Sequence, residues 1–344
     1  MPVSASDLLS DRQEAINRVH TVEKGYEILD RNPELTAILL RDHTTQKNIF
    51  WATESYAALG AGYQYNDPIT VESVCGTNRN IVKPRAFKTI DQQRQRSREM
   101  AEVFTPSWIC NKQNNLVDNA WFGREGVFNT EIDNIDGSHS WIINTEPVVF
   151  PKEKTWRDYV NENRLEITCG EAPYLVSRYD AVTGEPIPVE RRIGLLDRKL
   201  RIVGENTSSS GEWLKAAQSA YQSIYGFEWQ GDNLVLAREA LLYTFIDYYR
   251  AKFGKYPQIK SLFYIAYIIS WNIWQMDGLK GVIPNSCGER RIVEYDLFGE
   301  TVTICQCEGC KSGDIKKHNG VYALIKDWSA PKAKQKIRFI DLIK

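Results

Sequence analysis

Residues 165–170, with the sequence LEITCG, constrain the fold more than any other part of the 344-residue chain. The first five are apolar or β-branched apart from Glu166, which favours a short buried strand. A glycine at the end of a strand lets the backbone turn sharply and approach a ligand closely. Glu166 lies inside this strand, where a carboxylate is costly unless it is paired. The segment predicts a nucleotide-binding loop or, more simply, a strand that ends in a turn.

A second predicted strand ends in an acid. Residues 224–229 (IYGFEW) form a short apolar run that ends at Glu228, and residues 232–253 follow as a long amphipathic helix. In a Rossmann-like sheet, a glycine turn after one strand and a carboxylate at the end of the next hold a ribose. Glu228 is therefore placed to accept hydrogen bonds from both ribose hydroxyls. The alternative is a strand-end acid at the surface.

Two more segments accompany these strands. In residues 101–110 (AEVFTPSWIC), Pro106 fits the first turn of a helix that runs to about Trp121, with Thr105 as its cap. In residues 272–279 (NIWQMDGL), a strand leads to Asp277, which could equally form a turn before the glycine that follows it.

In this order, residues 102–106, 166–175, 226–228 and 272–279 resemble the motifs of the amino-group DNA methyltransferases of restriction–modification systems. The bacterial group labelled restriction endonuclease subunit M is the nearest in pattern, and the resemblance extends from about residue 90 to the end. It is looser in the glycine loop, where Ala172 replaces a second glycine, and in the long spacer at 176–223. The resemblance implies S-adenosylmethionine binding by Phe104, Thr105, Pro106, Glu166, Cys169, Gly170, Ala172, Tyr174, Glu228, Trp229, Asp277 and Leu279.

The same resemblance implies an α/β fold. Residues 96–344 are expected to form a doubly wound, Rossmann-like methyltransferase sheet, incomplete in this chain, and residues 1–95 an N-terminal α+β or helical extension. The Asn-Pro-Pro-Tyr type of loop that holds the target base in this family does not occur in the sequence, which stops just short of where the family carries it.

We therefore expect the cofactor-binding subunit of a site-specific adenine-N6 DNA methyltransferase, inactive alone, with no catalytic residue of its own. Its partners would be double-stranded DNA and a second methyltransferase or specificity subunit that carries the Pro-Pro-aromatic loop. The alternative is a non-catalytic subunit of a restriction or phage-defence complex that binds S-adenosylmethionine or DNA.

Other segments indicate local structure. Residues 1–31 have helical periodicity, and residues 34–41 and 48–52 predict a pair of strands. Residues 127–150 alternate around Asp136-Gly137, which is typical of a hairpin.

A basic segment lies between residues 79 and 98, where seven basic residues face a single acid, Asp91. Clustered cations attract a phosphate backbone, although the whole chain has 43 basic and 44 acidic residues and no bulk positive charge. The alternative is a solvated linker and helix face. The candidate DNA-binding residues are Arg79, Lys83, Arg85, Lys88, Arg94, Arg96 and Arg98.

The cysteines indicate a metal site rather than disulfides. Seven cysteines, an odd number, suit a reducing cytoplasm. Cys307 and Cys310 form a Cys-x2-Cys turn, and Zn²⁺ prefers four sulfur or nitrogen ligands. Cys287 and His318 could complete a zinc loop over residues 287–318, Cys305 could replace one ligand, or the thiols could be free. The sequence also lacks an apolar run long enough for a membrane span and a signal-peptide pattern, which predicts a cytoplasmic location.

Overall fold

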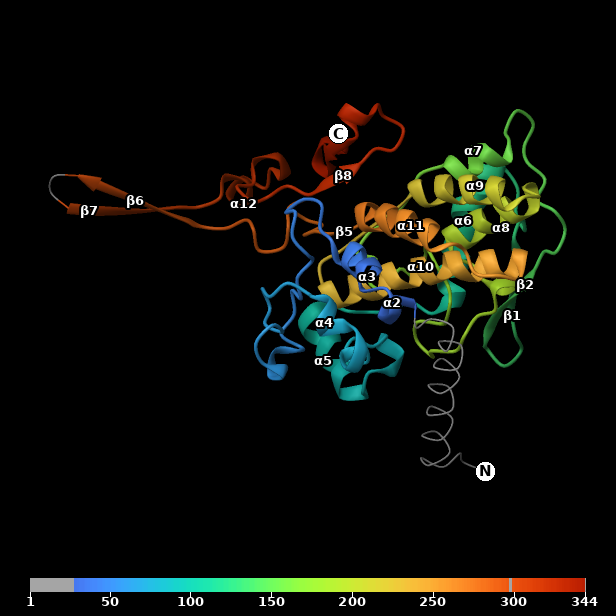
Figure 1. Ribbon diagram of the computed structural model, residues 1–344, viewed down its shortest axis with the longest axis horizontal. Coiled ribbons are helices and arrows are strands. Elements are labelled where there is room, and N and C mark those ends of the chain that lie inside the picture. The colour runs from blue at the N-terminus through green and yellow to red at the C-terminus, as the bar shows by residue number, and fades with distance from the viewer. Residues whose placement is uncertain (1–27, 297–298, 344) are drawn as a thin grey trace, which may run out of the picture.

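The computed structural model describes residues 28–296 and 299–343 (Figure 1). Its centre is a parallel sheet of β3 (Arg164–Glu166), β4 (Ile224–Glu228) and β5 (Ile273–Gln275), in the order β3-β4-β5. The predicted mixed α/β class is therefore confirmed. Within the described ranges the parallel sheet has these three strands, fewer than a full Rossmann sheet. Most of the helix predicted over residues 1–31 lies outside the described residues, which begin with α2 (Ile28–Arg31).

Helices cover one face of the sheet. After β3 the chain forms α8 (Leu195–Asn206) and α9 (Ser210–Gln222), and between β4 and β5 it forms α10 (Gly231–Phe253) and α11 (Ile259–Asn272). Ile224 and Ile273 point into the main core together with buried side chains of all four helices. Most positions of α10 are buried, including the polar Asp232, Asn233 and Arg238, so the helix lies inside the protein and does not expose one polar face as an amphipathic surface helix would.

The opposite face is covered differently. Phe227, Trp274 and Met276 form a second apolar cluster with Ala323 and Ile325. The last two belong to the segment around β8 (Leu324–Lys326), which pairs antiparallel with β9 (Lys336–Arg338). The doubly wound arrangement, with helices on both faces, is thus not formed by the described residues, because this short antiparallel pair covers the second face.

The N-terminal part corrects one prediction. Residues 34–41 do not form a strand, because α3 (Pro33–Leu40) is a helix that begins with proline and has Glu34 in its first turn. Leu35 and Leu39, four residues apart, are both buried, which a helical face explains. The segment after it packs on α10, where the Gly231 N–H donates to the Trp51 carbonyl at 2.9 Å. Buried residues from both sides of position 95, where the sequence suggested a boundary, belong to the same main core, for example Leu35 and Leu234.

The middle of the chain follows the predictions closely. α5 (Ile90–Met100) precedes α6 (Ser107–Phe122), and the predicted hairpin is β1 (Asn129–Asp133) with β2 (His139–Ile143). Thr105 does not cap α6, however, since the Ser107 N–H donates to the Asp180 carboxylate at 2.8 Å instead. The remaining α-helices here are α4 (Val71–Val74) and α7 (Trp156–Asn161), and short 3-10 helices occupy Ala57–Leu59, Gly76–Asn78, Arg85–Phe87, Val189–Arg191, Ile315–Lys317, Lys332–Lys334 and Phe339–Leu342.

A two-stranded ribbon projects from this body. β6 (Arg290–Asp296) and β7 (Gly299–Cys305) pair antiparallel and extend far from the remaining elements, with α12 (Glu308–Ser312) near the base of the ribbon (Figure 1). Among the described helices, none is long and apolar enough to cross a membrane.

Candidate cofactor and metal sites

The carboxyl ends of the three parallel strands meet at one edge of the sheet. Gly170 follows β3, Glu228 ends β4, and Asp277 comes two residues after β5. The Gly170 N–H donates to Glu228 Oε2 at 2.8 Å, and the Met276 N–H donates to the Glu228 carbonyl at 3.0 Å. The glycine loop, the acid and the third segment are therefore joined directly at this edge, which is where open α/β sheets bind ligands.

The loop after β3 turns back tightly. Thr168, Gly170 and Ala172 have φ angles of +47°, +52° and +63°. Ala172 thus adopts the left-handed conformation that a glycine takes at lower cost. Glu166 accepts the N–H groups of Tyr174 at 3.4 Å and Leu175 at 3.2 Å, which supplies the pairing that its buried carboxylate requires. Burial nevertheless raises the pKa of Glu166 well above its usual range.

The segment around Phe104 packs on this loop. A Cβ atom added at Gly170 would lie 3.4 Å from the Phe104 ring, and that ring is buried. Burial raises the pKa of Tyr174, on the far side of the loop, and the nearby Thr105 side chain opposes that rise. The structure therefore brings together two segments that are more than 60 residues apart in the sequence.

Glu228 and Asp277 differ in their surroundings. Burial raises the pKa of Glu228, and the N–H groups of Gly170 and Gln230 oppose that rise by donating to one oxygen each. Carboxylate oxygens carry two lone pairs each, so acceptor capacity remains for hydroxyl groups. Asp277 accepts the Leu279 N–H at 3.0 Å, which is the turn geometry that the sequence allowed.

The other predicted cofactor residues lie at varying distances from this edge. Cys169 is buried beneath the loop, and its N–H donates to the Phe227 carbonyl. The Trp229 indole N–H donates to the Tyr65 hydroxyl at 3.0 Å. The side chain of Leu279 is exposed, so any contact it makes is at the surface.

The basic segment does not present seven cations to solvent. Lys88 and Arg96 are buried, and Arg96 contacts Glu102 and Asp232. Arg79 pairs with Asp30 and Arg85 lies near Glu102. Only Lys83, Arg94 and Arg98 among the seven are exposed. Sequence reasoning missed the inward orientation because the acidic partner Asp232 lies more than 130 residues further along the chain.

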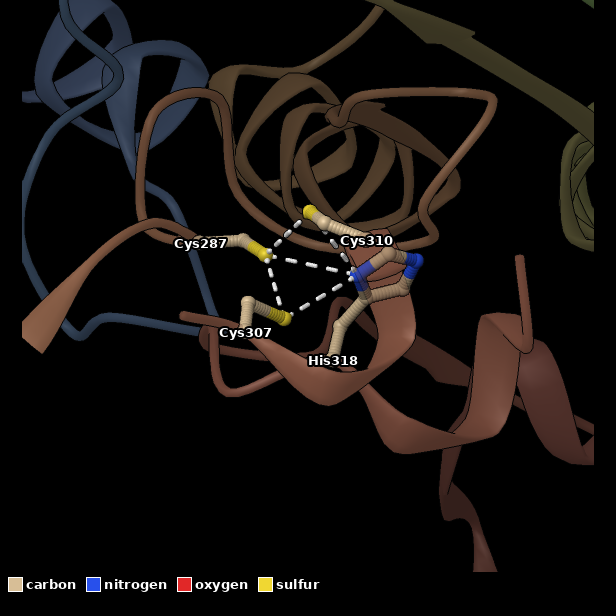
Figure 2. Close-up of side chains that lie close together, drawn as sticks. All are labelled: Cys287, Cys307, Cys310 and His318. Atoms are coloured by element: carbon tan, nitrogen blue, oxygen red, sulfur yellow. Dashed lines mark hydrogen bonds between the residues drawn. The ribbon is translucent and has the colours of Figure 1, made fainter. Parts of the chain in front are cut away.

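Four potential metal ligands converge at the base of the ribbon (Figure 2). Cys287 Sγ lies 3.2 Å from Cys307 Sγ, 3.5 Å from Cys310 Sγ and 3.3 Å from His318 Nδ1. All four ligand atoms lie within 4.8 Å of one another, so the cluster could bind a metal ion. Cys305 is exposed and lies outside the cluster, so it does not replace any of these four residues as a potential ligand.

Two glycines let the ligand-bearing loops approach. A Cβ at Gly309, within the Cys-x2-Cys turn, would lie 2.7 Å from His318 Nδ1, and one at Gly320 would lie 2.9 Å from Cys287 Cβ. Gly309 is a signal in the sequence that could have strengthened the prediction, since a small residue between two chelating cysteines leaves room for a third ligand.

The thiols of the cluster are unequal. Burial acts to raise the pKa of the Cys307 thiol, but nearby hydrogen-bond donors, among them the Asn319 N–H at 3.3 Å, outweigh it and lower that pKa to about 5. Burial, together with the neighbouring thiols, raises the pKa of Cys287 to about 12. A cation at the centre would favour the thiolate form that metal binding needs.

No protein-family model, curated protein or solved structure matches this chain. Its function must therefore be argued from the geometry of these two sites.

Proposed function

We propose that the chain is the S-adenosylmethionine-binding subunit of a DNA amino-methyltransferase that acts on adenine N6. One observation carries the proposal. Three segments that the family resemblance singles out end at the same edge of one parallel sheet, and the fourth, around Phe104, packs on the glycine loop there. Parallel strands always end at the same edge, so the packing of the separate segment 102–106 on the glycine loop is the contact that most supports a shared ligand site.

In this proposal the residues hold and orient the cofactor. Glu228 accepts hydrogen bonds from the ribose hydroxyls, and Asp277 accepts one from the adenine amino group. Phe104 and Thr105 contact the methionine end. When bound, S-adenosylmethionine would supply the methyl group of its sulfonium to N6 of the target adenine in the DNA, leaving S-adenosylhomocysteine and a proton. The chain then contributes proximity and orientation rather than a nucleophile.

A partner would supply the remaining parts. Within the described ranges β3 pairs with β4 alone, so its other edge is open. Leu165 and Ile167 beside that edge are 46% and 65% exposed. Open strand edges with apolar neighbours favour pairing with another strand. We infer that a partner chain adds a strand here and brings the Pro-Pro-aromatic loop that stacks on the flipped base of double-stranded DNA.

Zinc is the metal that fits the second site best. Three thiolates and one imidazole are a preferred Zn²⁺ ligand set, and four protein ligands form a closed, structural site. Cys287 precedes β6, and Cys307 follows β7. The ion would therefore clamp both strands of the ribbon at its base.

The test is calorimetric titration of the intact chain with S-adenosylmethionine. We expect micromolar binding, weakened by about 10- to 100-fold in Glu228→Gln, since hydrogen bonds to charged acceptors contribute about 1.5–3 kcal/mol. Glu190→Gln, at an exposed position, is the matched control and should bind normally. Equal affinity of Glu228→Gln and the parent chain would contradict the assigned role.

A second experiment separates methylation from mere binding. The chain, mixed with the product of the adjacent reading frame and duplex DNA, should transfer the methyl group of labelled cofactor to adenine. Cofactor binding without methyl transfer in that mixture would favour the non-catalytic alternative, for which the absence of a Pro-Pro-aromatic loop from this sequence speaks.

A further inference from the structure

Three buried polar atoms near the glycine loop have no hydrogen-bond partner among the described residues. They are Lys88 Nζ, Arg85 Nε and Glu102 Oε1. The Lys88 and Glu102 side chains are only 7% and 4% exposed. Arg85 Nε lies 3.9 Å from Glu102 Oε1, and Lys88 Nζ lies 3.8 Å from the nearest Asp232 oxygen. Buried polar atoms left without hydrogen bonds are costly, so either a ligand or ordered water is expected to satisfy them.

The surrounding acids are already engaged. Asp232 accepts hydrogen bonds from the Tyr56 hydroxyl at 2.9 Å and from Arg96. Arg96 Nε also donates to Glu102 Oε2 at 2.7 Å, which leaves Glu102 Oε1 as the open oxygen. Burial acts to raise the pKa of Asp232, but Arg96 and Lys88 outweigh it and lower that pKa. Lys88 and Arg85 therefore lie at ion-pair distance from Asp232 and Glu102, but Lys88 Nζ, Arg85 Nε and Glu102 Oε1 still lack a hydrogen bond.

These atoms adjoin the proposed cofactor site. The backbone N–H of Arg85 donates at 2.7 Å to the side-chain carboxylate of Glu171, the residue directly after Gly170. The Arg85 guanidinium lies 5.5 Å from the centre of the Phe104 ring. Phe104 in turn packs on Gly170, whose N–H reaches Glu228. Arg85 and Glu102 thus lie close to the segment that carries Phe104 and packs on the glycine loop.

We propose that Lys88, Arg85 and Glu102 form a subsite for the zwitterionic α-amino-acid end of the ligand. The ligand carboxylate accepts hydrogen bonds from Lys88 Nζ and Arg85 Nε, and its ammonium group donates to Glu102 Oε1. This inference rests on the proposed function. It makes Lys88 and Arg85, which the sequence analysis proposed as DNA-binding residues, cofactor-binding residues instead.

The charge pattern selects this chemistry over others. A fully ionised phosphate would accept hydrogen bonds from both cations but has no donor to offer Glu102 Oε1. A neutral nucleoside could form hydrogen bonds here but would offer no charge to the two cations or to Glu102. Only a group with both an anion and a cation within a few ångströms satisfies the set, and charge-assisted hydrogen bonds of this kind are the stronger ones.

The first test uses the unaltered chain and three ligands in calorimetric titrations. S-adenosylhomocysteine carries the complete amino-acid end, decarboxylated S-adenosylmethionine lacks the carboxylate, and 5′-methylthioadenosine lacks both charged groups. We expect S-adenosylhomocysteine to bind at least ~10-fold more tightly than each of the other two, because each leaves buried charges unpaired. Equal affinities would overturn the subsite and show that ordered water alone occupies these atoms.

A variant pair adds a second readout. Lys88→Met should weaken S-adenosylhomocysteine binding to the level of 5′-methylthioadenosine and leave the latter unchanged, whereas Lys215→Met, at an exposed position on α9, should change neither. Equal losses for both ligands would refute the specific role of Lys88. If the variant does not fold, as judged by its thermal unfolding, the ligand series on the parent chain decides alone.

The outcomes also separate the two proposals. Binding of all three ligands with one affinity overturns the subsite and leaves the proposed function standing. Binding of none by the folded chain overturns both.

Discussion

Zinc occupancy is the prediction that the geometry defines most sharply. The perturbation is Cys307→Ser, which removes one of the four ligands, and the matched control is Cys305→Ser, two residues earlier and outside the cluster. We expect the parent chain and the control to carry one zinc ion per chain after purification under reducing conditions. Cys307→Ser should lose it.

The magnitude follows from the ligand count. Structural sites of this kind bind Zn²⁺ with about 10–16 kcal/mol at neutral pH, so one ligand of four contributes about 2.5–4 kcal/mol, or about a 100- to 1000-fold change in affinity. Mass spectrometry measures the zinc content per chain, and competition with a chromogenic chelator measures the zinc affinity.

The same perturbation should act on the ribbon more than on the body. An isolated two-stranded hairpin is marginally stable in water, and the cluster lies at its base. Arg290 and Arg291 in β6 are already exposed, and metal removal should let trypsin cleave after them by unfolding the ribbon while the helical core stays intact. Zinc-free parent protein, or equal loss of zinc from Cys305→Ser and Cys307→Ser, would refute the reasoning.

Three further predictions concern stability. Asp118→Asn should destabilise the fold by about 3–5 kcal/mol in urea titrations, because it leaves the buried Arg198 without its charge partner at 2.6 Å. A loss below about 1 kcal/mol, the scale of a surface substitution, would contradict this. Gly231→Ala should lower the melting temperature, since its Cβ would lie 2.0 Å from the Phe50 carbonyl oxygen, and an unchanged melting temperature would count against that close packing. Burial lowers the pKa of His43 from 6.5 to about 3, with a smaller contribution from nearby cations. Because the pKa of His43 is lower in the folded state, protonation of this residue favours the unfolded chain, and stability falls as the pH drops from about 6.5 toward 3. Between pH 7.5 and 5 the free energy of unfolding should decrease by about 1–2 kcal/mol after allowance for partial exposure. His43→Gln should make the free energy of unfolding less dependent on pH over this range.

The local patterns were sufficient for most elements of the body. The strand at 224–228, the long helix that follows it and the hairpin around Asp136-Gly137 all form where periodicity and turn residues predicted them. The Cys-x2-Cys turn also indicated its own chemistry, because two ligands three residues apart converge through local geometry alone. The strand predicted at 34–41 failed, because burial of one helical face in the main core outweighed the β-like composition of that segment.

The sequence by itself determined the mixed α/β class, the strand-end positions of Gly170, Glu228 and Asp277, and the residue types of the cysteine–histidine cluster, since these depend on short-range patterns of polarity and turn chemistry. Only the tertiary structure decided which charges face inward. Lys88 and Arg96 belong to a segment that looks like a polyanion-binding surface, and they turn toward Glu102 and Asp232 because buried acids require cations. The tertiary structure also decided that Cys305 lies outside the cluster that contains Cys307 and Cys310, although all three are cysteines within six residues of one another. Contacts between distant segments are set by packing of the whole chain, and no local pattern specifies them.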